Sequence, residues 1–390
     1  MLKKEITFIY SDSAEKAAYA PILKEAERRG YKTILTDNKY AKCEIGFYCQ
    51  HNNFPQYSKF ALIMLHDIIQ QYGNWPDLWF REPWDKYDIG ILPSDQWESN
   101  WNQCSQWKYT RPRVGMFKIG WPKADAINEL KNSVYKEKFF ADHGMDPMKR
   151  TVLYAPAWEN DNKEDDFVKA VLPLNVNILI KQWDADPEKF PLQVENVKRM
   201  EALHKSIPGV TILPPSTNIF EAIAISDILV SEESSTMCEA AMMSVPAISV
   251  SDWLIPDVKP SRLPKCDYDF VTFSTKAELS DTIRAMIENY ESYHRRISDF
   301  AKFNFLNIGK TSSMIMDIVD DCVEGKKIRY KMLNPNTDEK VPMRKEFRRR
   351  IHNFKMAMTY NYNVRYPLLG KLWSFVSHIV HFNDGTYKSR

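Results

Sequence analysis

The sequence predicts an α/β protein with two doubly wound, Rossmann-like parallel-sheet domains that face each other across a cleft, followed by a basic helical tail. Short apolar runs alternate with helix-compatible segments in two successive series, over about residues 5–119 and 151–303. A strand–helix–strand unit of about thirty residues implies parallel pairing of its strands. The 390 residues are enough for two domains, each with its own core.

The first domain is predicted at residues 1–127. Residues 5–10 form a β-rich run, and Asp12 with Glu15 gives a capping signal for a helix that ends at Gly30. Residues 31–35 supply the second strand of the unit. Further apolar runs, each leading into a loop or helix, lie at 44–48, 60–65, 89–92 and 114–119.

The second domain is predicted at residues 128–325 and begins with a polar connection. Its strands are predicted at 151–154, 176–180, 210–213, 227–230, 247–250 and 270–272. Helical patterns lie at 194–206, 219–224, 236–243, 277–289 and 293–303. The cleft between two such domains is the natural place for a ligand.

The composition excludes several classes of protein. Apolar residues make up 44% and charged residues 27%, which is typical of a soluble globular protein. Six scattered cysteines without a CxxC spacing favour a reducing cytoplasm and indicate neither a disulfide framework nor a metal site. The apolar stretch at 6–10 is too short for a signal peptide, and no apolar run reaches the ~18–20 residues of a membrane-spanning helix.

A tail at residues 326–390 differs from the rest of the chain. From 340 to 390 there are 11 Lys/Arg and two acids, so this segment carries +9 while residues 1–339 carry −7. A basic stretch at 344–355 precedes an aromatic, apolar one at 366–380, a pattern typical of an anchor on an anionic membrane surface. The alternative is a C-terminal helix packed on the body. Nucleic-acid binding is excluded because no recognisable module is present and the body is acidic.

The segment 224–250 carries the strongest candidate binding site. A buried strand runs into Ser234, Ser235 and Thr236, and Thr236 with Glu239 forms a capping-box pattern that opens a helix. Free backbone N–H groups and hydroxyls at such a turn suit a donor diphosphate. One of the neighbouring acids, Glu232 or Glu233, is a candidate acceptor of hydrogen bonds from a ribose or an acceptor hydroxyl. The alternative is ordinary helix capping.

His66 follows an apolar strand at the edge where parallel sheets bind ligands, and it is the candidate base for an acceptor hydroxyl. A structural histidine is the alternative. We place Asp12, Ser13 and Asp67 on the acceptor side of the cleft. Asp67 is not expected to pair with His66, because neighbouring residues of a strand face opposite ways.

Two turns supply further candidates. In the turn at 118–125, Trp121 and Asp125 are candidates for lining the cleft, with a linker turn as the alternative. After the first strand of the second domain, Pro156 stops the strand and Trp158 is positioned to lie against the donor, unless it is a packed core residue.

The order of these segments resembles the CDP-glycerol glycerophosphotransferase family of teichoic-acid and capsule enzymes. That family shows His-Gly-Thr after a strand, a G-[YW]-P-[RK]-x-D turn, an L-Y-A-P-T-W strand and an A-D-x-L-[IV]-[TS]-D-Y-S-S segment. The corresponding residues, within about 60–310, are His66; Gly120, Trp121, Pro122, Lys123 and Asp125; Leu153, Tyr154, Ala155, Pro156 and Trp158; and Ser226-Asp227 through Ser234-Ser235, closed by Val245-Pro246.

Three departures from the family pattern stand out. His-Gly-Thr becomes His66-Asp67-Ile68, and Asp-Tyr before the serines becomes Glu232-Glu233. The family has a second histidine, which the resemblance places at the donor phosphates. This chain has Lys181-Gln182-Trp183 at that place and no histidine. Lys181 is the candidate to supply positive charge there, and the change also leaves room for a different donor.

The resemblance implies a GT-B-type transferase that moves glycerophosphate, or a similar polyol phosphate, from a CDP-activated donor to a lipid-linked or glycan acceptor. We expect no cofactor, since the nucleotide-activated donor is a substrate, and the sequence does not indicate a divalent metal. The enzyme is expected in the cytoplasm, attached to the inner face of the membrane. A GT-B glycosyltransferase using a nucleotide sugar, a nucleotide-sugar epimerase and a catalytically degenerate scaffold are the alternatives. The oligomeric state stays open.

Overall fold

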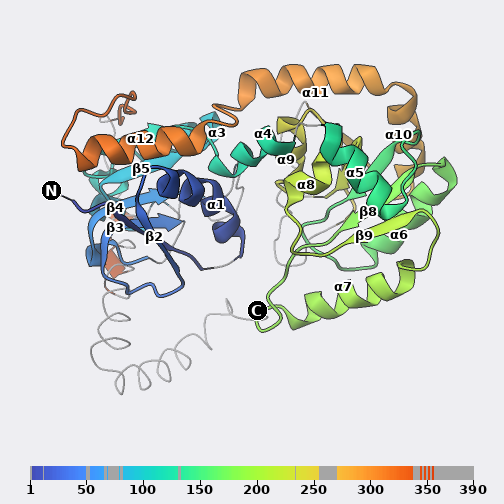
Figure 1. Ribbon diagram of the computed structural model, residues 1–390, viewed down its shortest axis with the longest axis horizontal. Helices are drawn as coiled ribbons and strands as arrows, with labels where there is room; N and C mark the ends of the chain where they lie inside the picture. The colour runs from blue at the N-terminus through green and yellow to red at the C-terminus, as the bar shows by residue number, and fades with distance from the viewer. Residues whose placement is uncertain are drawn as a thin grey trace.

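The computed structural model describes residues 2–11, 13–49, 53–65, 68, 79, 82–130, 133–232, 234–253, 270–336 and positions 343, 344, 347, 350, 351 and 354. Within them lie two six-stranded sheets in which every adjacent strand pair is parallel. Helices cover both sheets (Figure 1). The predicted fold class, two doubly wound α/β domains, is confirmed.

The first sheet has the order β2-β1-β3-β4-β5-β6. Its strands are β1 (Glu5–Ile9), β2 (Lys32–Thr36), β3 (Cys43–Cys49), β4 (Ser58–Met64), β5 (Ile89–Leu92) and β6 (Gly115–Lys118). Helix α1 (Ser13–Arg28) packs on one face through Tyr19 and Ile22. The other face is covered by a tryptophan-rich layer that includes α3 (Asp95–Asn102). Most tryptophans of the first domain are therefore core residues.

The second sheet has the order β12-β11-β10-β7-β8-β9. Its strands are β7 (Thr151–Tyr154), β8 (Asn177–Lys181), β9 (Val210–Leu213), β10 (Ile228–Ser231), β11 (Ala247–Val250) and β12 (Val271–Ser274). One face packs against α5 (Ser133–His143), α8 (Ile219–Ala224), α9 (Thr236–Met242) and α11 (Tyr290–Asn304). The other face packs against α6 (Lys163–Val171) and α10 (Leu279–Glu288), with α7 (Pro191–His204) beyond α6.

The chain crosses between the two sheets twice. It leaves β6 through the segment that ends in α4 (Ile127–Leu130), and it returns after α11 to α12 (Thr311–Val323). Figure 1 shows α12 beside α1, and Arg29 bonds both Asp317 and Asp320 at 2.7 Å. The prediction grouped everything up to residue 325 with the second domain, whereas α12 packs on the first sheet because its apolar face completes that core.

The segment after α12 also lies on the first domain. Leu333 donates its backbone N–H to the carbonyl of Met116 at 2.8 Å, which ties this segment to β6. Among the described residues, no helix is both long and apolar enough to cross a membrane.

Candidate active site

The candidate donor site lies at the carboxyl edge of the second sheet, where β7, β8 and β10 end side by side. Ligands of doubly wound sheets bind at this edge because the connecting loops open there. The described donor candidates lie at the ends of these three strands or just after them: Pro156 and Trp158 after β7, Lys181 as the last residue of β8, and Glu232, Ser234, Ser235 and Thr236 after β10.

The side chains of Ser234, Ser235 and Thr236 form a half-buried cluster of hydroxyl groups at the turn into α9. Ser234 Oγ accepts the Thr236 backbone N–H at 3.3 Å, and Thr236 Oγ1 donates to the carbonyl of Ala155 at 3.4 Å. The predicted capping box is wrong, because the Glu239 side chain pairs with Lys123 instead. Helix α9 has only seven residues, so the hydroxyls and nearby cations are better anion ligands than its weak dipole.

Glu232 does not face a ligand. Its side chain is fully buried, and Oε1 accepts hydrogen bonds from the backbone N–H groups of Ala157 at 3.1 Å and Trp158 at 3.0 Å. The Lys163 ammonium lies 3.2 Å from the same oxygen. Contrary to the prediction of a ribose or acceptor contact, Glu232 fixes the loop after β7. Glu233 lies outside the described residues.

Pro156 is buried, whereas Trp158 is half-buried beside two other rings. Trp158 stacks on Trp183 with ring centroids 5.5 Å apart and meets Phe190 edge-on at 5.6 Å. Trp183 and Phe190 follow β8, so this aromatic cluster joins two of the three loops at the edge. Trp158 is therefore both packed and partly accessible, which combines the two alternatives drawn from the sequence.

A buried polar network lies under these loops. Glu159 accepts hydrogen bonds from the Tyr154 hydroxyl at 2.7 Å and from Gln182 Nε2 at 3.0 Å. Gln182 also bonds Glu164, whose second oxygen lies 2.8 Å from His204 Nδ1. Burial raises the pKa of Glu159 to about 7. Sequence reasoning missed this network because its members come from β7, from the loops after β7 and β8, and from α6 and α7.

Lys181 ends β8 and is half-buried on the side of the sheet that α8 and α9 cover. Burial, together with repulsion from Lys123, lowers the pKa of its ammonium to about 8. Attraction to Glu239 and Asp184 acts in the opposite direction. Within the described part of the chain, no hydrogen bond or ion pair engages this ammonium.

Lys123 and Glu239 form an ion pair between the two domains. The Lys123 side chain is 18% exposed and that of Glu239 is 2% exposed. The Lys123 ammonium also lies 5.2 Å from the centroid of the Trp121 ring and 5.9 Å from that of Phe220. Trp121 is buried against Phe220 in the core that joins the domains, so it does not line a cleft as predicted.

Asp125 caps a helix instead of lining the cleft. Its carboxylate accepts the backbone N–H groups of Thr311 at 3.0 Å and Ser312 at 2.6 Å, at the start of α12. Burial raises the pKa of this carboxyl. Gly120 has a φ of +125°, and a Cβ there would lie 2.6 Å from the carbonyl oxygen of Leu306. The turn at 120–125 thus holds the outgoing and returning crossings together.

The acceptor side is less fully described. His66, Asp67 and Asp12 lie outside the described residues, and their predicted roles stay predictions. β4 ends at Met64, and Ser13 is an exposed residue at the start of α1.

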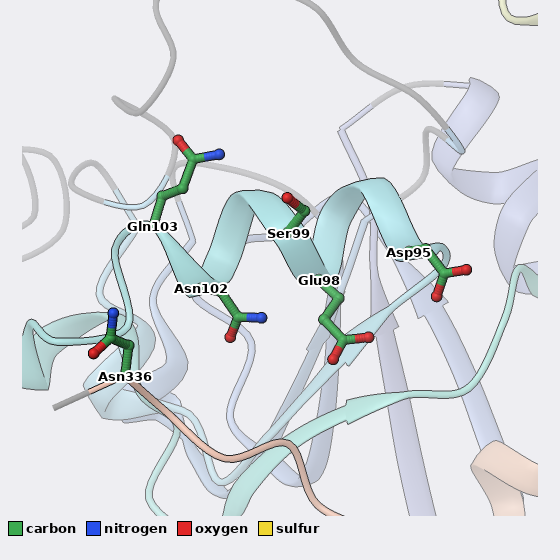
Figure 2. Close-up of a pocket in the computed structure, with 6 residues that line it drawn as sticks. All are labelled: Asp95, Glu98, Ser99, Asn102, Gln103 and Asn336. Carbon is green, nitrogen blue, oxygen red and sulfur yellow. The ribbon is translucent and has the colours of Figure 1, made fainter.

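Two surface pockets lie away from the donor residues. One, of about 470 Å³, is lined by polar residues of α3 together with Asn336 (Figure 2). Asp95 and Glu98 in that pocket both pair with Lys118. The other, of about 770 Å³, lies between β6 and the segment 325–332. Neither pocket contains a predicted site residue.

Two parallel-sheet domains joined by a double crossing, with cations and hydroxyls at the carboxyl edge of the second sheet, define a GT-B-type fold. A model of the family described as CDP-Glycerol:Poly(glycerophosphate) glycerophosphotransferase matches residues 70–320. The chain belongs to this family, which confirms the resemblance seen in the sequence.

Solved structures show the same fold. The wall teichoic acid polymerase TagF aligns with a TM-score of 0.60 and 15% identity over 83% of this chain and 90% of that chain. A putative UDP-N-acetylglucosamine 2-epimerase from Listeria monocytogenes aligns with a TM-score of 0.57 and 12% identity over 85% and 100%. The UDP-GlcNAc 2-epimerase from Neisseria meningitidis gives 0.55 and 13% over 82% and 100%. Comparison with curated proteins gave no match.

Proposed function

We propose that this enzyme transfers glycerophosphate from CDP-glycerol to a hydroxyl of a lipid-linked or glycan acceptor during synthesis of a cell-surface polymer such as teichoic acid or capsule. The observation that carries the proposal is the meeting of Lys181 with Ser234, Ser235 and Thr236 at one sheet edge, inside the segment that matches the family. A half-buried ammonium and half-buried hydroxyls at the same sheet edge suit a diphosphate.

The reaction is a displacement at phosphorus. The acceptor oxygen attacks the phosphorus that carries glycerol, and the bond from this phosphorus to the bridging oxygen breaks, so that CMP leaves with the electron pair. His66 takes the proton of the acceptor hydroxyl. Lys181 and the hydroxyls of Ser234 and Ser235 stabilise the negative charge that develops on the leaving CMP.

The test measures CMP release from CDP-glycerol in the presence of a membrane acceptor. His66→Ala is expected to lower kcat at least about 100-fold, the usual contribution of a general base. Lys24→Met is a matched control, because Lys24 pairs with Glu129 on the exposed surface of the first domain. Full turnover by His66→Ala would overturn the role of this residue. Turnover of UDP-sugars in place of CDP-glycerol would overturn the proposed donor.

Lys181 gives the proposal a pH dependence. A protonated ammonium attracts the diphosphate and a neutral amine does not, so the affinity for CDP should fall as pH rises through about 8. The dissociation constant of CDP, measured by titration calorimetry from pH 6.5 to 9, reports this fall. Lys181→Met should bind CDP more weakly at pH 6.5 and lack the fall. A fall of the same size in that variant would assign it to another group.

We further propose that residues 340–390 hold the enzyme on the anionic inner surface of the cytoplasmic membrane, near a lipid-linked acceptor. The described positions between 343 and 354 are helical. Met343, Phe347, Ile351 and Phe354 are 89%, 65%, 41% and 62% exposed, at a spacing that puts them on one helical face. An exposed apolar face with flanking Arg and Lys suits an interfacial helix.

Vesicle sedimentation tests this attachment. The chain truncated after residue 336 should lose binding to vesicles that contain phosphatidylglycerol, and Phe347→Ser/Phe354→Ser should weaken binding at low and high salt alike. A basic patch acting alone would instead be sensitive to salt only. Retained binding by the truncated chain would overturn the proposal.

A further inference from the structure

The geometry points to Lys123 as a second ligand for the donor diphosphate, contributed by the first domain and held at the site by Glu239. This inference rests on the proposed donor site and adds to it a residue from the other domain. Lys123 lies in the segment after β6 that crosses to the second domain, and its ammonium pairs with Glu239 of α9.

The local charges leave a cation to be balanced. Lys123, Lys181 and the buried Glu239 interact, whereas Asp184, which also attracts Lys181, is exposed to solvent. Within this largely buried group, one carboxylate therefore faces two ammonium groups. An unbalanced charge removed from water is costly. A diphosphate that binds between the two lysines supplies the missing negative charge, so its arrival relieves their mutual repulsion.

The position of Glu239 brings Lys123 to the hydroxyls. Glu239 follows Ser235 by four residues and Thr236 by three, and such residues share one side of a helix. An ion pair with Glu239 therefore holds the Lys123 ammonium about one turn from the predicted diphosphate ligands. The ammonium has three N–H donors, so it can bond a phosphate oxygen while it keeps Glu239.

The aromatic contacts orient this side chain. The rings of Trp121 and Phe220 lie within 5.2 and 5.9 Å of the ammonium, one from each domain. They restrict the lysine to the junction, which lowers the entropy lost when it binds an anion. Donor binding at Lys123 consequently adds a contact between the domains, and the affinity for nucleotide depends on how they are held together.

The test compares CDP and CMP by titration calorimetry. Lys123→Met alone leaves Glu239 buried without a counter-charge, so the main variant is Lys123→Met/Glu239→Gln, which removes both charges. We expect its dissociation constant for CDP to rise at least about tenfold, as for the loss of a charge-assisted hydrogen bond. CMP, which lacks the second phosphate, should lose less. Lys24→Met, which also removes one lysine of the first domain, should bind both as the wild type does.

The outcomes separate this inference from the proposed function. If the folded double variant binds CDP within twofold of the folded Glu239→Gln variant, Lys123 is a structural bridge and the inference is overturned. Glu239→Gln alone should bind CDP more tightly, and weaker binding by that folded variant would also overturn it. If the wild type binds UDP but not CDP, the proposed donor fails, and the same variants test Lys123 with UDP.

Discussion

Two buried lysine–glutamate pairs flank the turn between β10 and α9, and they are built differently. Lys163 and Glu232 both belong to the second domain, and their side chains are 1% and 0% exposed. Lys123 and Glu239 come from different domains, and Lys123 keeps 18% of its side-chain surface in contact with solvent. The first pair closes a loop, whereas the second lies at an open edge.

The partners of each pair explain the difference. Lys163 also donates to the carbonyl of Trp158 at 3.0 Å, and Glu232 accepts two backbone N–H groups, so this pair is saturated by the loop that it holds. The pair of Lys123 and Glu239 lies beside a further cation, Lys181. Charges next to a binding motif thus divide into those that shape it and those that remain available to a ligand.

The largest expected effect comes from breaking the closed pair. Lys163→Met leaves the fully buried Glu232 carboxylate without its counter-charge, which should lower the free energy of unfolding by about 3–5 kcal/mol. Lys163→Met/Glu232→Gln should regain part of this loss. Urea unfolding followed by circular dichroism measures both. Lys123→Met should cost less, about 1–3 kcal/mol, because Lys123 is 18% exposed and Lys181 still attracts the Glu239 carboxylate. Equal losses would contradict the distinction.

Glu159 extends the comparison to a buried acid that forms no ion pair with a lysine among the described residues. Its pKa is about 7 in the folded protein against 4.5 in the unfolded chain. The folded state therefore binds more protons between these values, and its stability should fall by up to about 3 kcal/mol as pH rises from 4.5 through 7. Burial raises the pKa of Glu164 in the same direction.

Unfolding midpoints in urea between pH 5 and 8.5 measure this slope. Glu159→Gln keeps a hydrogen-bonding side chain without a titrating group, so it should flatten much of the slope. A Glu159→Gln variant with the full wild-type slope would assign the pH dependence to other groups.

The fold could be predicted because strands alternate with helices along most of the chain and the central strands are mainly apolar. Runs such as 151–154 and 247–250 are buried on both faces, and the structure places strands at those residues. The position of α12 could not be predicted. Its apolar face fits either sheet by pattern alone, and the choice is made by long-range contacts such as that between Arg29 and Asp317.

The candidate site could be predicted in part. The predicted strand ends located the edge that carries Lys181 and Ser234, because the loops that follow the strands of a parallel sheet all lie at its carboxyl edge. The roles of the acids could not be read in the same way. A carboxylate beside a motif binds a ligand or a backbone N–H, and only the fold shows that Glu232 and Asp125 have backbone donors within reach. The sequence analysis identified Lys123 only as part of the turn at 118–125 and predicted no binding role for it.

The smallest expected effect tests that reading of Asp125. Asp125→Ala removes the acceptor for the first N–H groups of α12 and should cost about 1 kcal/mol, as for other helix caps, with CDP affinity unchanged. Asp125→Asn keeps an acceptor oxygen and should lose less than half as much. Unfolding in urea and calorimetric titration with CDP separate the two roles. Loss of a helix cap lowers only the free energy of unfolding, whereas loss of a donor-binding residue lowers the affinity for CDP. If Asp125→Ala kept its stability but lost turnover, Asp125 would belong to the acceptor side of the cleft, as its sequence position first indicated.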